Sequence, residues 1–191
     1  MRAARAVLLP IALAAGLAAP VAAQPDRPVP VAAAPLADGA RDFDFEFGAW
    51  KAHISRRLRP LTGSTEWVEY EGVSTVHRLW GGNANIGELD VQGPAGRIQG
   101  MSLRLYNPET KQWSIRWANS RDGELGEAMV GGFARGRGEF YNQETLGERA
   151  IFVRFVFSDI RRDAFRFEQA FSADGGRTWE ANWLSAFERR A

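Results

Sequence analysis

The chain has 191 residues and no cysteine, and its 24 basic side chains nearly balance 23 acidic ones. Without cysteine there are no disulfides and no thiolate chemistry, so the fold must rest on its hydrophobic core. Because the charge is balanced, nothing in the composition favours nucleic acid or an anionic membrane surface as a partner.

The first 23 residues have the three parts of a secretory signal peptide. Arg2 and Arg5 form a short basic start, residues 6–21 are apolar, and Val21-Ala22-Ala23 offers small residues for cleavage. A membrane anchor is the alternative, but the stretch is short for a spanning helix and Pro10 interrupts it. We therefore expect cleavage at residue 23, a secreted or periplasmic protein, and no membrane span after processing.

Two segments follow the predicted signal peptide. Residues 24–41 are rich in proline and alanine and predict a disordered linker. Residues 42–191 predict one domain, in which aromatic and β-branched runs alternate with Gly, Asn, Asp and Pro clusters. This pattern is typical of strands and turns, and we expect strands at 46–57, 66–79, 85–91, 97–106, 112–119, 127–134, 137–143, 149–159, 163–172 and 178–188.

The links between these strands are short. Asn107-Pro108-Glu109-Thr110 places proline where a type I turn favours it, and Asp174-Gly175-Gly176 suits a tight hairpin. Links of this length join only antiparallel neighbours, and closing the sheet removes its exposed edges. The sequence therefore predicts an all-β fold, an antiparallel meander β-barrel of about ten strands. A two-sheet sandwich is the alternative.

Four of the predicted strands share a pattern of one aromatic-rich face and one arginine on the opposite face. The four arginines are Arg104, Arg116, Arg154 and Arg166. Because the apolar faces are so continuous, we expect them to fill the interior and the arginines to point outward, with Arg116 and Arg154 as the exceptions. Arginines that point inward would form a cationic site, partly neutralised by Glu168, that orients a ligand carboxylate.

The first strand begins with Gly48-Ala49-Trp50, which resembles the G-x-W signature of lipocalins and other calycins. The resemblance implies that the tryptophan closes one end of the barrel. It also implies that a basic residue near the end of the chain, Arg189 or Arg190, packs over the indole ring. Such a cation–π contact contributes about 0.5–2 kcal/mol.

Further segments between Phe43 and Arg189 resemble an uncharacterised bacterial domain-of-unknown-function family assigned to the calycin-like (lipocalin-like) barrels. The resemblance implies the barrel fold and no particular activity. The segments that carry it are Gly63-Ser64-Thr65-Glu66-Trp67, Gly81-Gly82, Leu103-Arg104-Leu105-Tyr106-Asn107-Pro108, Gln112-Trp113-Ser114-Ile115 and Glu168-Gln169-Ala170-Phe171-Ser172.

Two other features point less directly to chemistry. The run Ser172 to Trp179 fits the Asp-box pattern of sialidase propellers, but a propeller repeats it and this chain has one copy, so we interpret it as a hairpin device. His53 and His77 are the two histidines. A haem site would need one of them, but two separated histidines without cysteine are a weak metal signal, so we assign no metal and no cofactor.

The leading functional hypothesis is an exported barrel that binds a small apolar or aromatic molecule, with or without a carboxylate. A cofactor-free isomerase, lyase or hydrolase with His77 or Glu168 as base is the alternative, and a structural role with a filled interior is another. Catalytic residues and oligomeric state are not assigned. The candidate ligand-binding residues are His77, Trp80, Asn85, Glu88, Arg104, Arg116, Trp117, Arg154, Phe155, Phe167, Glu168 and Trp183.

Overall fold

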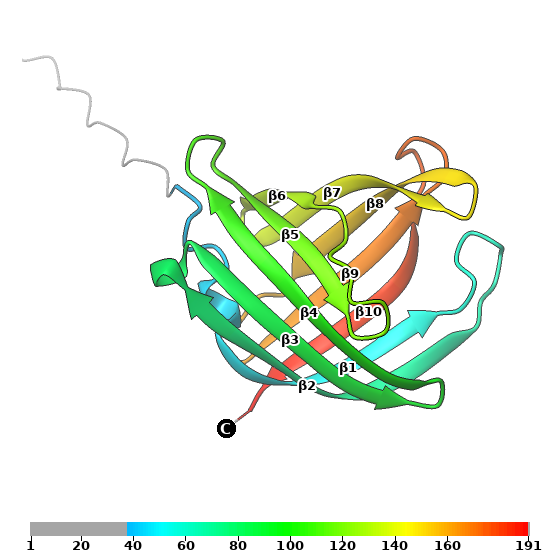
Figure 1. Ribbon diagram of the computed structural model, residues 1–191, viewed down its shortest axis with the longest axis horizontal. Coiled ribbons are helices and arrows are strands. Elements are labelled where there is room, and N and C mark those ends of the chain that lie inside the picture. The colour runs from blue at the N-terminus through cyan, green and yellow to red at the C-terminus, as the bar shows by residue number, and fades with distance from the viewer. Residues whose placement is uncertain (1–37, 191) are drawn as a thin grey trace, which may run out of the picture. The chain divides into compact units, whose positions relative to one another are not determined.

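The computed structural model describes residues 38–190, in which ten antiparallel strands close into a barrel (Figure 1). Each strand pairs with its neighbours along the chain, and the first pairs with the last. The strands are β1 (Gly48–Arg57), β2 (Trp67–Leu79), β3 (Ala84–Gly93), β4 (Gly96–Asn107), β5 (Gln112–Asn119), β6 (Met129–Ala134), β7 (Arg137–Leu146), β8 (Arg149–Ser158), β9 (Ala164–Ser172) and β10 (Glu180–Arg189). The predicted meander barrel is confirmed, and each predicted strand overlaps an observed one.

The predicted signal peptide and most of the predicted linker lie outside the described residues, so both stay predictions. Within the described part, no helix is long and apolar enough to cross a membrane. Two short 3-10 helices accompany the strands, η1 (Asp44–Glu46) before β1 and η2 (Trp80–Gly82) between β2 and β3.

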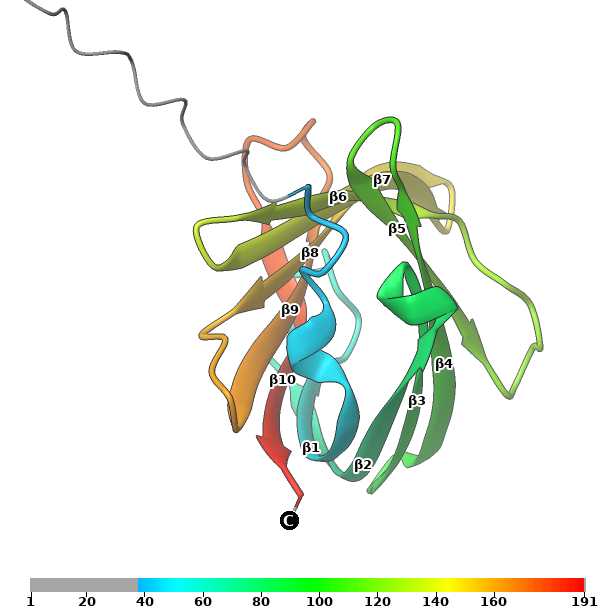
Figure 2. The ribbon, with the colours of Figure 1, turned by 90° about the vertical axis from the view of Figure 1, so that its left-hand side faces the viewer.

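The segment that precedes β1 lies across one end of the barrel. Figure 2 shows η1 between the side formed by β8–β10 and the side formed by β3–β5. Phe43 is 1% exposed, and its ring centroid lies 5.0 Å from that of Trp113 and 4.9 Å from that of Phe133. The indole nitrogen of Trp113 also donates to the carbonyl oxygen of Gly39, at 2.8 Å. We call this the closed end of the barrel.

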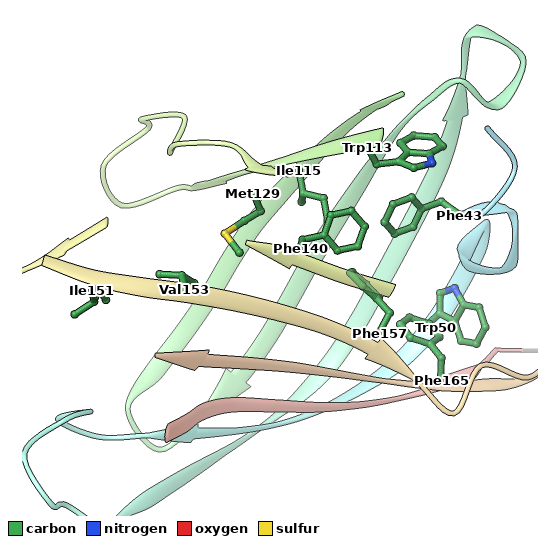
Figure 3. Close-up of a cluster of buried hydrophobic side chains, with 10 residues drawn as sticks. All are labelled: Phe43, Trp50, Trp113, Ile115, Met129, Phe140, Ile151, Val153, Phe157 and Phe165. Atoms are coloured by element: carbon green, nitrogen blue, oxygen red, sulfur yellow. The ribbon is translucent and has the colours of Figure 1, made fainter. Parts of the chain in front are cut away.

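The core at the closed end is a cluster of buried aromatic and aliphatic side chains. Figure 3 shows most of them converging from several strands and from the segment before β1, with Ile151 and Val153 farther along β8. Burial of a large apolar side chain contributes about 1.5–3 kcal/mol, so this cluster is the main source of stability at the closed end. Its members are Phe43, Trp50, Trp113, Ile115, Met129, Phe140, Ile151, Val153, Phe157 and Phe165.

The contact implied by the lipocalin resemblance is present. Trp50 is fully buried, and its indole nitrogen donates to the carbonyl oxygen of Glu46 at 2.7 Å. The guanidinium carbon of Arg189 lies 4.1 Å from the centroid of the Trp50 ring. Arg189 also donates to the carbonyl oxygens of Phe45 and Phe47, each at 2.9 Å. One arginine therefore ties the end of β10 to the segment that closes the barrel.

The Asp-box-like run forms the connection between β9 and β10. The Asp174 carboxylate accepts hydrogen bonds from the backbone nitrogens of Arg177 and Thr178 and from the Thr178 hydroxyl. The Ser172 hydroxyl accepts from the backbone nitrogen of Gly176 at 2.9 Å. These bonds confirm the interpretation of the run as a hairpin device.

The expectation that the arginine of β4, Arg104, points outward is wrong. Arg104 is 7% exposed and points into the barrel, as does Ser102, so Leu103 and Leu105 lie on the outer face. The alternation of side chains along a strand predicts which residues share a face, but not which of the two faces is inside the barrel. Here the inward arginine forms an ion pair with a buried carboxylate, that of Glu46.

The expectation that Arg116 and Arg154 point into the barrel is also wrong. Arg116 lies on the outer face of β5, because Ile115 and Trp117 line the interior, and it donates to the carbonyl oxygen of Gly126. Arg154 lies outside β8, where it pairs with Glu168 at 3.0 Å and stacks over Trp179. The outward arginine expected on β9 is confirmed, since Arg166 is exposed and pairs with Asp159. These outward arginines find carboxylate, carbonyl or aromatic partners on the surface.

Candidate ligand-binding cavity

A cavity of about 380 Å³ lies inside the barrel. Its walls are mostly aromatic and aliphatic side chains that alternate inward along β3, β5, β6 and β8–β10. The interior is therefore filled at the closed end but not throughout, contrary to the hypothesis of a wholly filled barrel. The apolar lining residues are Leu89, Ile115, Trp117, Met129, Phe155, Phe157, Phe165, Phe167, Trp183 and Phe187.

The cavity has a buried floor and an exposed mouth. Glu46 and Arg104 form the floor, next to the core of the closed end. Arg56, Trp117 and Trp183 form the mouth, because they also line a neighbouring hollow of about 280 Å³ that is bordered by the exposed residues Arg121 and Asp122. The Arg56 guanidinium lies 6.0 Å from the centroid of the Trp183 ring. A ligand that enters at the mouth would meet aromatic walls first and the charged floor last.

Trp117 owes its position to the absence of a side chain on the neighbouring strand. Gly100 of β4 lies beside it, and a Cβ atom there would come within 2.0 Å of the Trp117 ring. The indole therefore occupies the space that a side chain at position 100 would fill, and it forms part of the cavity wall. Any larger residue at position 100 would push the ring away from this place.

The floor is an ion pair with an amide beside it. Nη1 of Arg104 contacts Oε2 of Glu46 and donates a hydrogen bond to Oδ1 of Asn85 at 2.9 Å. Glu46 is 2% exposed and Asn85 is 0% exposed. The guanidinium carbon of Arg104 lies 4.9 Å from the centroid of the Phe43 ring, so an aromatic face covers part of the cation.

Burial works against both charges of the pair. It raises the pKa of Glu46 above its usual range, while the nearby Arg104 opposes that rise. It lowers the pKa of Arg104, while Glu46 opposes that fall. An arginine stays protonated in proteins, and contact with its guanidinium favours the carboxylate form of Glu46. The floor is therefore a pair of opposite charges with no net charge.

Several polar atoms of the floor are buried without a hydrogen-bond partner among the described residues. They are the donors Nε of Arg104 and Nδ2 of Asn85, and the acceptor Oε2 of Glu46, which contacts Arg104 only as an ion pair. Buried polar groups are nearly always satisfied, and an unsatisfied donor costs about 1–3 kcal/mol. The unsatisfied donors beside one cavity mark the floor as a place where an acceptor is missing.

Two other polar side chains along the cavity, Gln169 and Ser185, are already paired. The Gln169 amide donates to Oδ1 of Asn182 at 2.7 Å, and the Trp183 indole donates to the Ser185 hydroxyl at 2.9 Å. The register between β9 and β10 shifts between Ala181 and Trp183, so the strands bulge at Asn182. The bulge restores the inward direction of Trp183, Ser185 and Phe187 along the rest of β10.

The structure brings about half of the predicted ligand-binding residues to the cavity. Asn85 is buried behind the floor beside Arg104. Glu88 borders the cavity but is exposed, and it alternates with the inward Gly87 and Leu89. The predicted residues that line the cavity are Glu88, Arg104, Trp117, Phe155, Phe167 and Trp183.

The remaining predicted residues lie on the outside. His77 is exposed on the outer face of β2, and Trp80 is 75% exposed in η2. Arg116, Arg154 and Glu168 are on outer strand faces, as described above. Neither base of the predicted enzyme alternative, His77 or Glu168, therefore faces the cavity. A haem inside the barrel would not reach His77 either.

Sequence reasoning missed the residue that defines the floor. Glu46 stands in Phe43-Asp44-Phe45-Glu46-Phe47, where it alternates with aromatic residues just before the G-x-W signature. A carboxylate flanked by phenylalanines near the barrel closure was the available signal. Among the described residues, no group of three or more His, Cys, Asp or Glu side chains could hold a metal ion.

The sequence matches no protein-family model and no curated protein. Among solved structures, it is similar to an S-type phycobiliprotein lyase from Guillardia theta, with 11% identity and a TM-score of 0.52 over 78% of this chain and 90% of that one. A designed fluorescence-activating β-barrel is 12% identical, with a TM-score of 0.42 over 81% of this chain and 100% of that one. The likeness to the lyase concerns the fold alone. Together with the closed ten-strand barrel, it supports the antiparallel β-barrel expected from the sequence.

Proposed function

We propose that this protein is an exported barrel that binds a small apolar or aromatic molecule in its interior cavity. The observation that carries the proposal is the cavity of about 380 Å³ with aromatic walls and a polar floor. Ligand pockets in proteins usually measure about 300–1,000 Å³ and combine apolar walls with a few polar groups that orient the ligand. The cavity has this size and this composition.

The aromatic walls support a ring-bearing ligand. Phe167 meets Phe155 and Phe157 with ring centroids 5.1 Å apart in both cases, in tilted or edge-on arrangements. Rings in these orientations present both faces and edges to the cavity, and aromatic pairs gain about 0.5–1.5 kcal/mol beyond area burial. Trp117 and Trp183 add two more ring systems at the mouth.

Export is proposed from the signal-peptide pattern of residues 1–23. A secreted or periplasmic barrel would meet its ligand outside the cytoplasm. Membership in the uncharacterised calycin-like family is proposed on the segments quoted above, and it adds no activity.

The binding proposal predicts that filling the cavity weakens binding of a neutral fluorescent probe, N-phenyl-1-naphthylamine. Phe155→Trp adds volume inside the cavity and should raise the Kd of the probe at least about tenfold, because cores resist overpacking. Phe152 is on the outer face of the same strand and 40% exposed, so Phe152→Trp is the matched control. Fluorescence titration measures both variants, with circular dichroism to verify folding.

Two outcomes would contradict the proposal. One is that the probe does not bind the unaltered protein. The other is that Phe155→Trp and Phe152→Trp bind it equally well, which would place the probe on the outer surface.

A further inference from the structure

We infer that the ligand carries a neutral hydrogen-bond acceptor, such as a carbonyl oxygen, which binds at the floor formed by Glu46 and Arg104, and that it is not a carboxylate. The inference rests on the proposed function, because it assigns the chemistry of a ligand in the same cavity. It also departs from the sequence-based expectation that inward arginines would bind a ligand carboxylate.

The charge of the floor is the first argument. A lone buried arginine would attract a carboxylate, but Glu46 already contacts Nη1 of Arg104. The pair sits at the buried end of the cavity, where both residues are less than a tenth exposed. A ligand carboxylate there would leave two negative charges against one positive charge in a medium that solvates charge poorly. A neutral acceptor adds no charge and avoids that cost.

The other charged groups near the cavity do not favour an anionic ligand at the floor either. The remaining charged residues that line the cavity are Arg56, Glu88, Glu127 and Glu144, and all four are exposed. Water screens exposed charges, so they act weakly on the buried floor. Three of the four are acidic, so they too disfavour an anionic ligand.

The unused donors are the second argument. A guanidinium has five N–H groups in a planar fork, and among the described residues acceptors face only Nη1 of Arg104. Nε of Arg104 and Nδ2 of Asn85 are buried without partners. Oε2 of Glu46 has no hydrogen bond within the described chain either, but it contacts Nη1 of Arg104 in the ion pair. Asn85 lies behind the floor, so the unused donor that belongs to the cavity lining is on Arg104. A carbonyl oxygen at the end of an apolar ring system would supply an acceptor for it without introducing charge.

The test compares three molecules that share one ring system and differ only at the polar end. They are 2-acetylnaphthalene with a neutral ketone, 2-ethylnaphthalene without a polar atom, and 2-naphthoate with a carboxylate. Displacement of bound N-phenyl-1-naphthylamine at about pH 7 gives their relative affinities. We expect the ketone to bind roughly tenfold more tightly than the hydrocarbon, and at least about tenfold more tightly than the carboxylate.

Two variants test whether the floor causes this order. In Glu46→Leu/Arg104→Met the floor is apolar, so the ketone should lose its advantage over the hydrocarbon while both still bind. In Glu46→Gln the positive charge of Arg104 is no longer neutralised, so naphthoate should gain at least about tenfold relative to the ketone. Arg166→Met removes an exposed arginine on the outer face of β9, where it pairs with Asp159, and should change none of the three affinities.

The outcomes separate this inference from the proposed function. Equal binding of ketone and hydrocarbon, or tightest binding of naphthoate by the unaltered protein, would overturn the inference and leave the cavity as a binding site. Failure of every naphthalene and of the fluorescent probe to bind would instead overturn the proposed function. Because Glu46→Gln keeps a hydrogen-bonding side chain in place, it gives a result even if the double variant does not fold.

Discussion

At the scale of single residues, the feature that most distinguishes this barrel is a buried pair of opposite charges. Glu46 and Arg104 come from segments far apart in the chain. Each supplies the opposite charge that offsets the cost of burying the other. Removing charges from water is costly, and their mutual attraction recovers that cost only with good geometry and additional hydrogen bonds. Because several polar atoms at this floor have no hydrogen-bond partner among the described residues, the desolvation cost of the two charges is only partly offset.

The pair makes a prediction about stability. Arg104→Met leaves the buried carboxylate of Glu46 without a counterion and should lower the free energy of unfolding by about 3–5 kcal/mol. Glu46→Leu/Arg104→Met replaces both charges with apolar side chains and should be nearly neutral or stabilising by about 1–4 kcal/mol. Urea unfolding followed by tryptophan fluorescence measures both variants. A double variant clearly less stable than the unaltered protein would show instead that the pair itself stabilises the fold.

At the scale of elements, the connection between β9 and β10 is organised around one carboxylate. Asp174 accepts hydrogen bonds from Thr178, Ser172 and Arg177, and these bonds hold the pKa of its carboxyl well below the usual range. Trp179, at the end of the turn, then packs on the outer face against Tyr141, with ring centroids 6.1 Å apart. The turn thus fixes both the hairpin and a small aromatic contact outside the barrel.

This hairpin predicts a pH dependence with a definite sign. A carboxyl whose pKa is lower in the folded state contributes stability above its unfolded pKa, and the contribution is lost as pH falls through the folded pKa. The unaltered protein should therefore lose stability more steeply below about pH 4 than Asp174→Asn does. Urea midpoints between about pH 5 and pH 2 measure the difference. Asp163→Asn changes an exposed carboxylate outside this turn and serves as the control; if its slope changes as much as that of Asp174→Asn, the turn is not the cause.

At the scale of the whole molecule, neighbouring strands of the barrel pair over unequal lengths. We call each such strand pairing a seam. β1 and β2 pair over ten residues, whereas β5 and β6 pair only from Trp113 to Ile115 with Met129 to Gly131. The chain from 120 to 128 connects these two strands, and Gly126 and Glu127 within it line the cavity. The weakest seam of the barrel therefore borders the cavity.

The unequal seams predict the order of local opening. Amide hydrogens of Ser114 and Val130 should exchange at least about tenfold faster than those of Ile54 and Tyr70 on the long β1–β2 seam, because fewer backbone bonds resist opening. Hydrogen exchange followed by NMR measures these rates. Uniform protection around the barrel would mean that it opens only as one cooperative unit.

The strands and their antiparallel order could be predicted from the amino-acid sequence, because both depend on local signals. The structure then showed closure into a barrel rather than the alternative sandwich. Alternating aromatic residues separated by turn residues located all ten strands, and the short links left antiparallel neighbours as the only arrangement. Gly48-Ala49-Trp50 located the closed end, and Arg189 took the place over the indole that the lipocalin resemblance implied. The Asp-box-like run predicted the last hairpin because its hydrogen bonds lie within eight consecutive residues.

The direction in which the polar residues face depends on long-range contacts that the sequence pattern does not encode. Alternation places Ser102 and Arg104 on the same face of β4, but only the register with β3 and β5 turns that face inward. The partner that makes burial of Arg104 acceptable, Glu46, is 58 positions earlier in the chain and belongs to no strand. A buried charge depends on a counterion brought near by the fold, and spacing along the sequence carries no information about that distance. The barrel could therefore be predicted from local patterns, while the chemistry of its floor depended on contacts across the closed end.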